Sequence, residues 1–196
     1  YKVEGPNGLN GYISSAVIIE ANVKIFSDLR GEELISAVAY MNNLGIINGF
    51  ENGTFRPNQQ LERRHAAAFL IRALNLELPE GYTRNNKELK PGDLGYNEMT
   101  IVEAHGLMGQ GSNYNPTAPL TRAQMAQILT RAFGPDGEGY YRVPATIHQF
   151  NDVKQSSEIY PYVNMLYGNG ITISDPYNPY SPVTRGQFAL FLMRTL

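Results

Sequence analysis

The sequence lacks cysteine and tryptophan and has only three histidines among its 196 residues. Without cysteine the chain can form no disulfide bond, and no thiolate is present for catalysis or metal binding. The histidines, His65, His105 and His148, are scattered along the chain, which is a poor basis for a metal site. We therefore expect neither a metal ion nor a cofactor.

Strong charge and long apolar segments are also missing. The formal net charge is −2 and the pI is about 5.9, so the chain has no long-range field to attract nucleic acid or an anionic membrane. Any anion that binds must be held by local positive charge. No apolar run approaches the length of a transmembrane helix, and we expect no membrane insertion. Because the sequence begins at Tyr1 without a signal peptide pattern, we expect a processed or excised part of a larger protein.

The clearest positive signal is a motif that recurs around three arginines, Arg63, Arg122 and Arg185, which are 59 and 63 residues apart. Six residues before each arginine stands a proline, and an aromatic residue stands two before that proline. The prolines are Pro57, Pro116 and Pro179, and the aromatic residues are Phe55, Tyr114 and Tyr177. Chance does not readily produce three such matches, so the chain contains three repeats.

A helix is predicted directly after each arginine. Apolar residues stand three, six, seven and eleven positions beyond it, which places them on one helical face. In the second and third copies Thr121 and Thr184 begin a Thr-x-x-Gln capping box, in which the hydroxyl and the glutamine side chain satisfy amides of the first turn. The arginine is then the first helical residue. Glu62 replaces the threonine in the first copy, so we expect that helix to be less well capped.

A second, weaker helix is predicted before each aromatic-proline turn, and each of these helices ends at a glycine. An acidic residue lies 17 or 18 positions before the glycine, and Asp28 and Asp152 are interpreted as helix caps. Phenylalanine precedes two of the acids, whereas the middle copy has Asn86 at that position. The glycines are Gly45, Gly106 and Gly170, and the acids are Asp28, Glu88 and Asp152.

Each repeat thus contains two helices, and the predicted fold is all-α. The predicted boundaries are 26–79, 80–143 and 144–196, with linkers rich in turn-forming residues between them. Units of this size bury too little surface to be stable alone, so we expect them to pack on one another. Segment 1–25 is predicted to form a short N-terminal helix, within 13–24, that covers an exposed flank of the array.

This pattern resembles the S-layer homology domain, whose repeats run Phe-x-Asp-Val, a helix, Gly-Ile-x-x-Gly, Phe-x-Pro, then Leu-Thr-Arg-Ala-Glu and a helix. The resemblance covers about residues 26–196. It implies a pseudo-threefold trimer of repeats around a central three-helix bundle, with pyruvylated secondary cell wall polymer held in the grooves between neighbours. It also implies an extracellular position at the bacterial cell surface. The best local matches are at 26–29, 45–49, 55–57, 120–126 and 150–153.

The arginines are the predicted centres of ligand binding. An arginine in the first turn of a helix combines a planar guanidinium with free backbone amides and the positive end of the helix dipole, which suits a ketal carboxylate. Alternatively, each arginine pairs with an acid such as Asp28 or Asp152 and locks neighbouring repeats together. The aromatic residues either offer a flat face to a sugar or plug a small core. The predicted ligand-binding residues are Arg63, Arg122, Arg185, Phe55, Tyr114, Tyr177, Asp28 and Asp152.

Three other functions compete with this interpretation, and the sequence argues against the first of them. An enzyme would need a catalytic constellation, and the sequence offers no Ser/His/Asp, Cys/His or His-Glu-x-x-His arrangement, so we expect no catalytic residue. A protein interaction module would use the grooves for S-layer lattice contacts or a docked partner. A tether would bind peptidoglycan or its attached polymer, as related repeats on outer-membrane proteins are thought to do. The sequence leaves the glycan, the number of competent grooves and the cargo undetermined.

Overall fold

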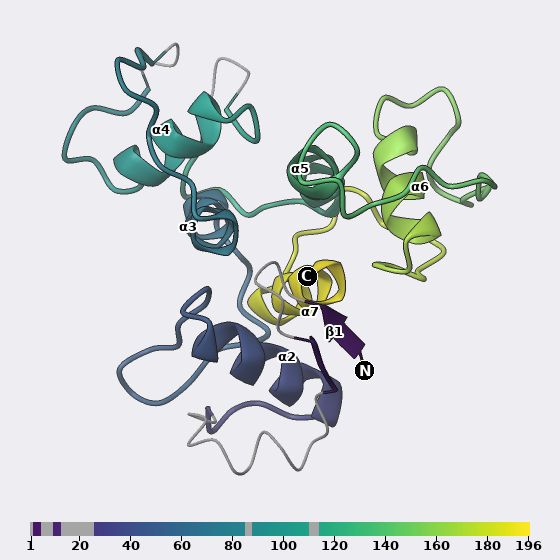
Figure 1. Ribbon diagram of the computed structural model, residues 1–196, viewed down its shortest axis with the longest axis horizontal. Helices are drawn as coiled ribbons and strands as arrows, with labels where there is room; N and C mark the ends of the chain where they lie inside the picture. Colours follow the sequence, from purple (N-terminus) through teal and green to yellow (C-terminus); the bar gives the residue numbers. More distant parts are fainter. Residues whose placement is uncertain (1, 5–9, 13–25, 85–87, 110–113) are drawn as a thin grey trace. The chain divides into compact units, whose positions relative to one another are not determined.

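The computed structural model describes residues 2–4, 10–12, 26–84, 88–109 and 114–196 (Figure 1). Two short strands near the N-terminus, β1 (Lys2–Glu4) and β2 (Asn10–Tyr12), pair antiparallel. The helix predicted within 13–24 lies outside the described residues. From residue 26 onward the regular structure that is described is α-helical, which confirms the predicted all-α class.

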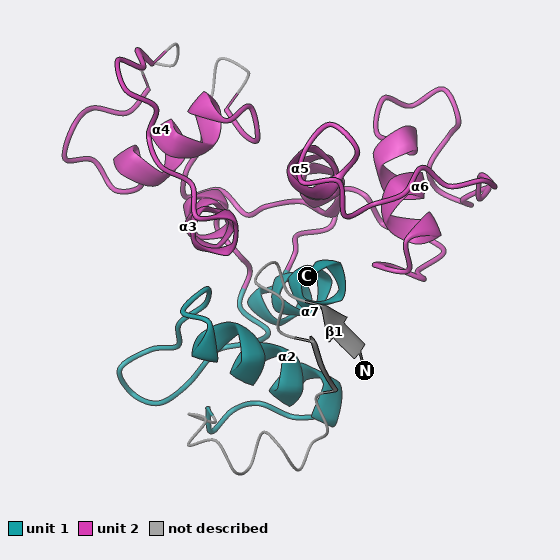
Figure 2. Ribbon diagram, in the orientation of Figure 1, with its two compact units in different colours: residues 1–59, 184–196 teal, residues 60–183 magenta. Residues whose placement is uncertain are grey.

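The chain divides into two compact units, which Figure 2 colours separately. Unit 1 contains residues 1–59 and 184–196, and unit 2 contains residues 60–183. In unit 1, α2 (Glu32–Asn43) packs against α7 (Arg185–Thr195). In unit 2, α3 (Arg63–Leu74) packs against α4 (Tyr96–Ala104), and α5 (Arg122–Phe133) packs against α6 (Tyr160–Gly168). Each pair joins the second helix of one predicted repeat to the first helix of another.

The arginine helices begin and bury their apolar faces as predicted. Arg63, Arg122 and Arg185 are the first residues of α3, α5 and α7. In α5 the Thr121 hydroxyl accepts a hydrogen bond from the Gln124 amide at 3.2 Å, and the Gln124 side chain accepts one from the Thr121 amide at 3.1 Å. An equivalent capping box opens α7, whereas Glu62 makes no side-chain cap for α3. The apolar residues that are buried on these helices include Phe69, Leu70, Met125, Ile128, Leu129, Phe133, Phe188, Phe191 and Leu192.

Backbone bonds from the aromatic-proline turns cover the first amides of these helices. In α5 the Arg122 amide donates to the Ser181 carbonyl at 3.0 Å, and the Ala123 amide donates to the Pro179 carbonyl at 2.8 Å. The first two amides of α3 donate in the same way to carbonyls of 116–118, and those of α7 to carbonyls of 57–59. The N-terminal amides are therefore already bonded, and the expectation that they are free to bind an anion is wrong.

A closed cycle of backbone hydrogen bonds joins the three segments that precede the arginines. Within unit 2, the Leu61 amide donates to the Val183 carbonyl, the Val183 amide to the Leu120 carbonyl, and the Leu120 amide to the Leu61 carbonyl, each at 2.8 Å. All three side chains have no exposed surface. Each of these residues lies two positions before its arginine, so the cycle relates equivalent positions of the three repeats. The pseudo-threefold trimer stays a prediction that agrees with this cycle.

Candidate functional site

Each of the three arginines binds the backbone of an aromatic-proline turn in another repeat. The bond always runs from the Nε–H of the arginine to the carbonyl oxygen of the aromatic residue. Because this contact fixes one edge of the planar guanidinium, the side chain has a defined orientation in all three copies. The Nε–oxygen distances are 2.7 Å for Arg63 to Tyr114, 2.6 Å for Arg122 to Tyr177 and 2.9 Å for Arg185 to Phe55.

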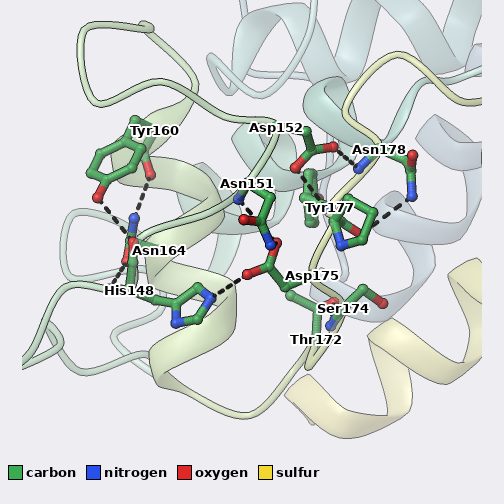
Figure 3. Close-up of polar contacts among 11 residues, drawn as sticks. His148, Asn151, Asp152, Tyr160, Asn164, Thr172, Ser174, Asp175, Tyr177 and Asn178 are labelled. Carbon is green, nitrogen blue, oxygen red and sulfur yellow. Dashed lines mark hydrogen bonds and ion pairs between the residues drawn. The ribbon is translucent and has the colours of Figure 1, made fainter.

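The acids bind the same turns through backbone amides, whereas the arginines bind them through backbone carbonyls. Both carboxylate oxygens of Asp28 accept hydrogen bonds, one from the Phe55 amide and one from the Arg56 amide, each at 2.7 Å. Asp152 accepts equivalent bonds from the Tyr177 and Asn178 amides at 2.8 and 2.6 Å (Figure 3). The helix-cap interpretation of these acids is therefore wrong, because α2 begins at Glu32 and α6 at Tyr160.

The pKa of Asp28 reflects this role. Desolvation favours the neutral carboxyl, but the amide bonds from Phe55 and Arg56 outweigh it and lower the pKa below its ordinary value. The carboxylate is thus charged at neutral pH and acts as a clamp for the turn.

Glu88 makes the equivalent contact in the middle repeat. Its carboxylate accepts hydrogen bonds from the amides of Tyr114 and Asn115. The sequence predicts Glu88 as the acid of the middle repeat but not as a site residue. Its common spacing from the following glycine was the signal that could have added it.

The aromatic residues of the turns are fully buried. Phe55, Tyr114 and Tyr177 each have 0% exposed surface. The Tyr177 hydroxyl donates to the Arg122 carbonyl at 2.9 Å, and burial raises the pKa of this phenol. The expectation that these rings offer a face to a sugar is not met in this conformation, because reaching them would require opening the core. They plug the core and present the carbonyl that the arginine binds.

The guanidinium groups of Arg122 and Arg185 cover two of these rings. The Arg122 guanidinium carbon lies 4.5 Å from the centre of the Tyr177 ring, and that of Arg185 lies 4.6 Å from the Phe55 ring. Only 8% of Arg122 and 5% of Arg185 is exposed, whereas Arg63 is half-buried. Burial and the neighbouring Arg56 lower the pKa of Arg185 to about 10, so it keeps its charge at neutral pH. Each arginine therefore has a structural role, whatever it also binds.

The middle repeat replaces its missing aromatic residue with an arginine. In the other repeats Phe26 packs against Phe55 with ring centres 5.7 Å apart, and Phe150 packs against Tyr177 at 6.1 Å. Beside Tyr114 the Arg84 guanidinium carbon instead lies 5.2 Å from the ring centre. Sequence reasoning missed Arg84 because it is two positions away from the place where the phenylalanine was expected.

The third turn has a polar support that involves Asp175 (Figure 3). The Asp175 carboxylate contacts His148 Nε2 at 3.0 Å and accepts the Asn151 amide at 3.0 Å. The Asn151 amide, followed by the contact with His148, lowers the pKa of this carboxyl. The His148 ring stacks on Tyr167 with centres 4.1 Å apart. These contacts connect the segment before α6 to the loop after it.

The described residues offer neither a metal-binding cluster nor a membrane-spanning helix. Within those residues no three His, Asp or Glu side chains are grouped so that they could hold a metal ion. None of the described helices combines the length and the apolar character needed to cross a membrane.

Comparison with known proteins identifies a family. The family model described as "S-layer homology domain" matches residues 25–67 and 149–189. The chain is 30% identical to the Surface-layer 125 kDa protein of Lysinibacillus sphaericus over 94% of its own length and 16% of that protein. It is 27% identical to the S-layer protein sap of Bacillus anthracis over 90% of its length and 22% of that protein. An amylopullulanase of Thermoanaerobacterium thermosulfurigenes is 26% identical over 56% of the chain and 6% of the enzyme. The chain thus spans less than a quarter of each of these relatives.

Proposed function

The chain belongs to the S-layer homology domain family, and on this premise we propose that it anchors a larger protein non-covalently to the bacterial cell surface. Its ligand in this proposal is an anionic, pyruvylated secondary cell wall polysaccharide. S-layer proteins and a cell wall amidase among the relatives support the wall as the place of action. The matched amylopullulanase shows that a related segment also occurs in an enzyme, and in the present chain we assign no catalytic role.

The observation that carries the proposal is the repeated orientation of Arg63, Arg122 and Arg185. Each guanidinium is fixed through Nε to a turn carbonyl, so it loses little side-chain entropy when a ligand binds to its remaining N–H groups. A ketal carboxylate accepts charge-assisted hydrogen bonds from a guanidinium, worth roughly 1.5 to 3 kcal/mol for a contact. Because the helix amides are already bonded, the arginine side chain is the anion-binding group in this proposal.

Three such sites explain how one weak contact becomes an anchor. A polymer repeats its anionic group, and sites linked in one chain engage it with a high effective concentration, which raises avidity by about 100-fold or more. The overall charge of −2 does not oppose this, because the positive charge needed is local to each arginine.

Co-sedimentation with bacterial wall sacculi, before and after extraction of the secondary polymer, tests the proposal. We expect binding that is lost on extraction and weakened in Arg122→Gln. Lys154→Gln, which removes the same charge from an exposed position, is the matched control and should bind like the parent. Circular dichroism must show that Arg122→Gln keeps its helices. Equal binding to extracted sacculi would favour a peptidoglycan tether, and no binding to either would favour protein docking or S-layer lattice contacts.

A further inference from the structure

The residue after the aromatic residue is an arginine in the first turn, Arg56, and an asparagine in the other two turns. The Arg56 side chain is exposed, and its guanidinium carbon lies 3.7 Å from the centre of the Phe50 ring. The Arg185 guanidinium carbon lies 5.0 Å from the centre of the same ring. Two cationic groups of unit 1 therefore share one aromatic ring. Arg185 also donates to the Asn48 carbonyl at 2.8 Å, which fixes its position beside the loop.

The positive charges of Arg56 and Arg185 are only partly offset by an acid. Burial lowers the pKa of Arg185, and the nearby positive charge of Arg56 lowers it further, as expected for two like charges close together. Asp28 offsets part of this positive charge, since its carboxylate raises the pKa of Arg185, while both of its oxygens accept the amides of Phe55 and Arg56. Among the described residues Arg56 makes no ion pair, and neighbouring Glu51 is exposed. A bound anion between the guanidinium groups of Arg56 and Arg185 would relieve the repulsion between them.

The equivalent positions in the other turns are Asn115 and Asn178. Their backbone has the same left-handed conformation, with φ of 43° and 58° against 59° for Arg56. Their amides also bind the acid of the turn, as the Arg56 amide does. Asparagine tolerates this conformation better than most residues, and arginine has no such advantage. The backbone therefore does not explain the arginine of the first turn, and its side chain is the distinguishing feature.

We infer that the Arg185–Phe50–Arg56 cluster is a dianion site, selective for a glycan segment with two neighbouring anionic substituents. The sites of Arg63 and Arg122, with asparagine at the matching position, take one carboxylate each. This inference rests on the proposed function and adds that the three sites differ in the charge of the ligand they prefer.

Nuclear magnetic resonance of the full chain, labelled with ¹⁵N, can test each site separately through the arginine Nε–H signals. Two probes are compared: a methyl glycoside of a hexosamine with a pyruvate ketal, and the same glycoside with an added phosphate monoester. At Arg185 we expect the phosphorylated probe to bind about tenfold more tightly, the equivalent of one added charge-assisted contact. At Arg122 the two probes should differ by less than about threefold.

Exchanging the turn residues supplies the matched controls. Arg56→Asn should abolish the preference at Arg185 while the unphosphorylated probe still binds there, and Arg56→Lys should retain most of it. Asn178→Arg should create a smaller preference at Arg122. Equal binding of both probes to Arg185 in the parent, or a preference that persists in Arg56→Asn, would overturn the dianion site alone. No signal change at any arginine with either probe would overturn the proposed glycan function as well.

Discussion

Replacing Asp28 by asparagine tests how much the hydrogen bonds of its carboxylate to the first turn contribute to stability. The carboxylate accepts two backbone amide bonds at 2.7 Å, whereas an asparagine side chain offers one oxygen and would turn its NH₂ toward the other amide. A hydrogen bond to a charged group is worth about 1.5 to 3 kcal/mol, and the half-buried position of Asp28 argues for the lower end. We expect the free energy of unfolding to fall by about 2 kcal/mol, or Tm by about 4 to 8 °C.

The assay is thermal and urea unfolding followed by the circular dichroism of the helices. Asp136→Asn, in an exposed linker position, removes the same charge and serves as the control, with an expected change within about 0.5 kcal/mol.

The pH dependence of the free energy of unfolding tests the same contribution of Asp28 in a second way. Because the pKa of Asp28 is lowered in the folded state, its contribution is fully present above the ordinary aspartate value and is lost as pH falls through the folded pKa. The stability difference between the parent and Asp28→Asn should therefore be constant near pH 7 and shrink below about pH 4. A loss no larger than that of Asp136→Asn, or a difference that grows on acidification, would refute the clamp.

Two other substitutions test local packing. Gly49→Ala should cost about 1 to 3 kcal/mol in urea unfolding, because its Cβ would lie 2.0 Å from the Phe26 ring, and an unchanged midpoint would show that this contact relaxes freely. Thr184→Ala should cost about 1 kcal/mol by removing the hydroxyl that caps α7. A Thr184→Ser variant, which keeps the hydroxyl, should recover most of that loss, and failure to do so would argue against the capping box as the cause.

Local features of the fold could be predicted from the sequence. The capping boxes at Thr121 and Thr184 and the arginine at the first helical position were confirmed, because residues within one turn determine them. The prediction of which face of α5 is buried was also confirmed, since burial on one helical face follows the 3.6-residue period. These predictions needed no knowledge of partners distant in the chain.

Predictions that depended on distant partners were less successful. The predicted role of Asp28 and Asp152 was wrong because the amides that donate to their carboxylates lie more than twenty residues away, which periodicity does not reveal. The helix amides were expected to be free because the segments that cover them belong to another repeat. The contact of Arg84 was not predicted because a cation can occupy the place of an aromatic ring, whereas the repeat motif predicts an aromatic residue there. The ligand-binding role of the arginines stays a prediction.

The packing of α2 against α7 has a consequence for biosynthesis. All of unit 2 separates these helices in the chain, so α2 leaves the ribosome long before its partner exists. At ordinary rates of translation the delay is on the order of ten seconds, during which the buried face of α2, with Val38 and Met41, has no α7 to cover it. Unit 1 can therefore complete its core only after residues 184–196 are made, and a chain truncated before α7 leaves this face of α2 uncovered.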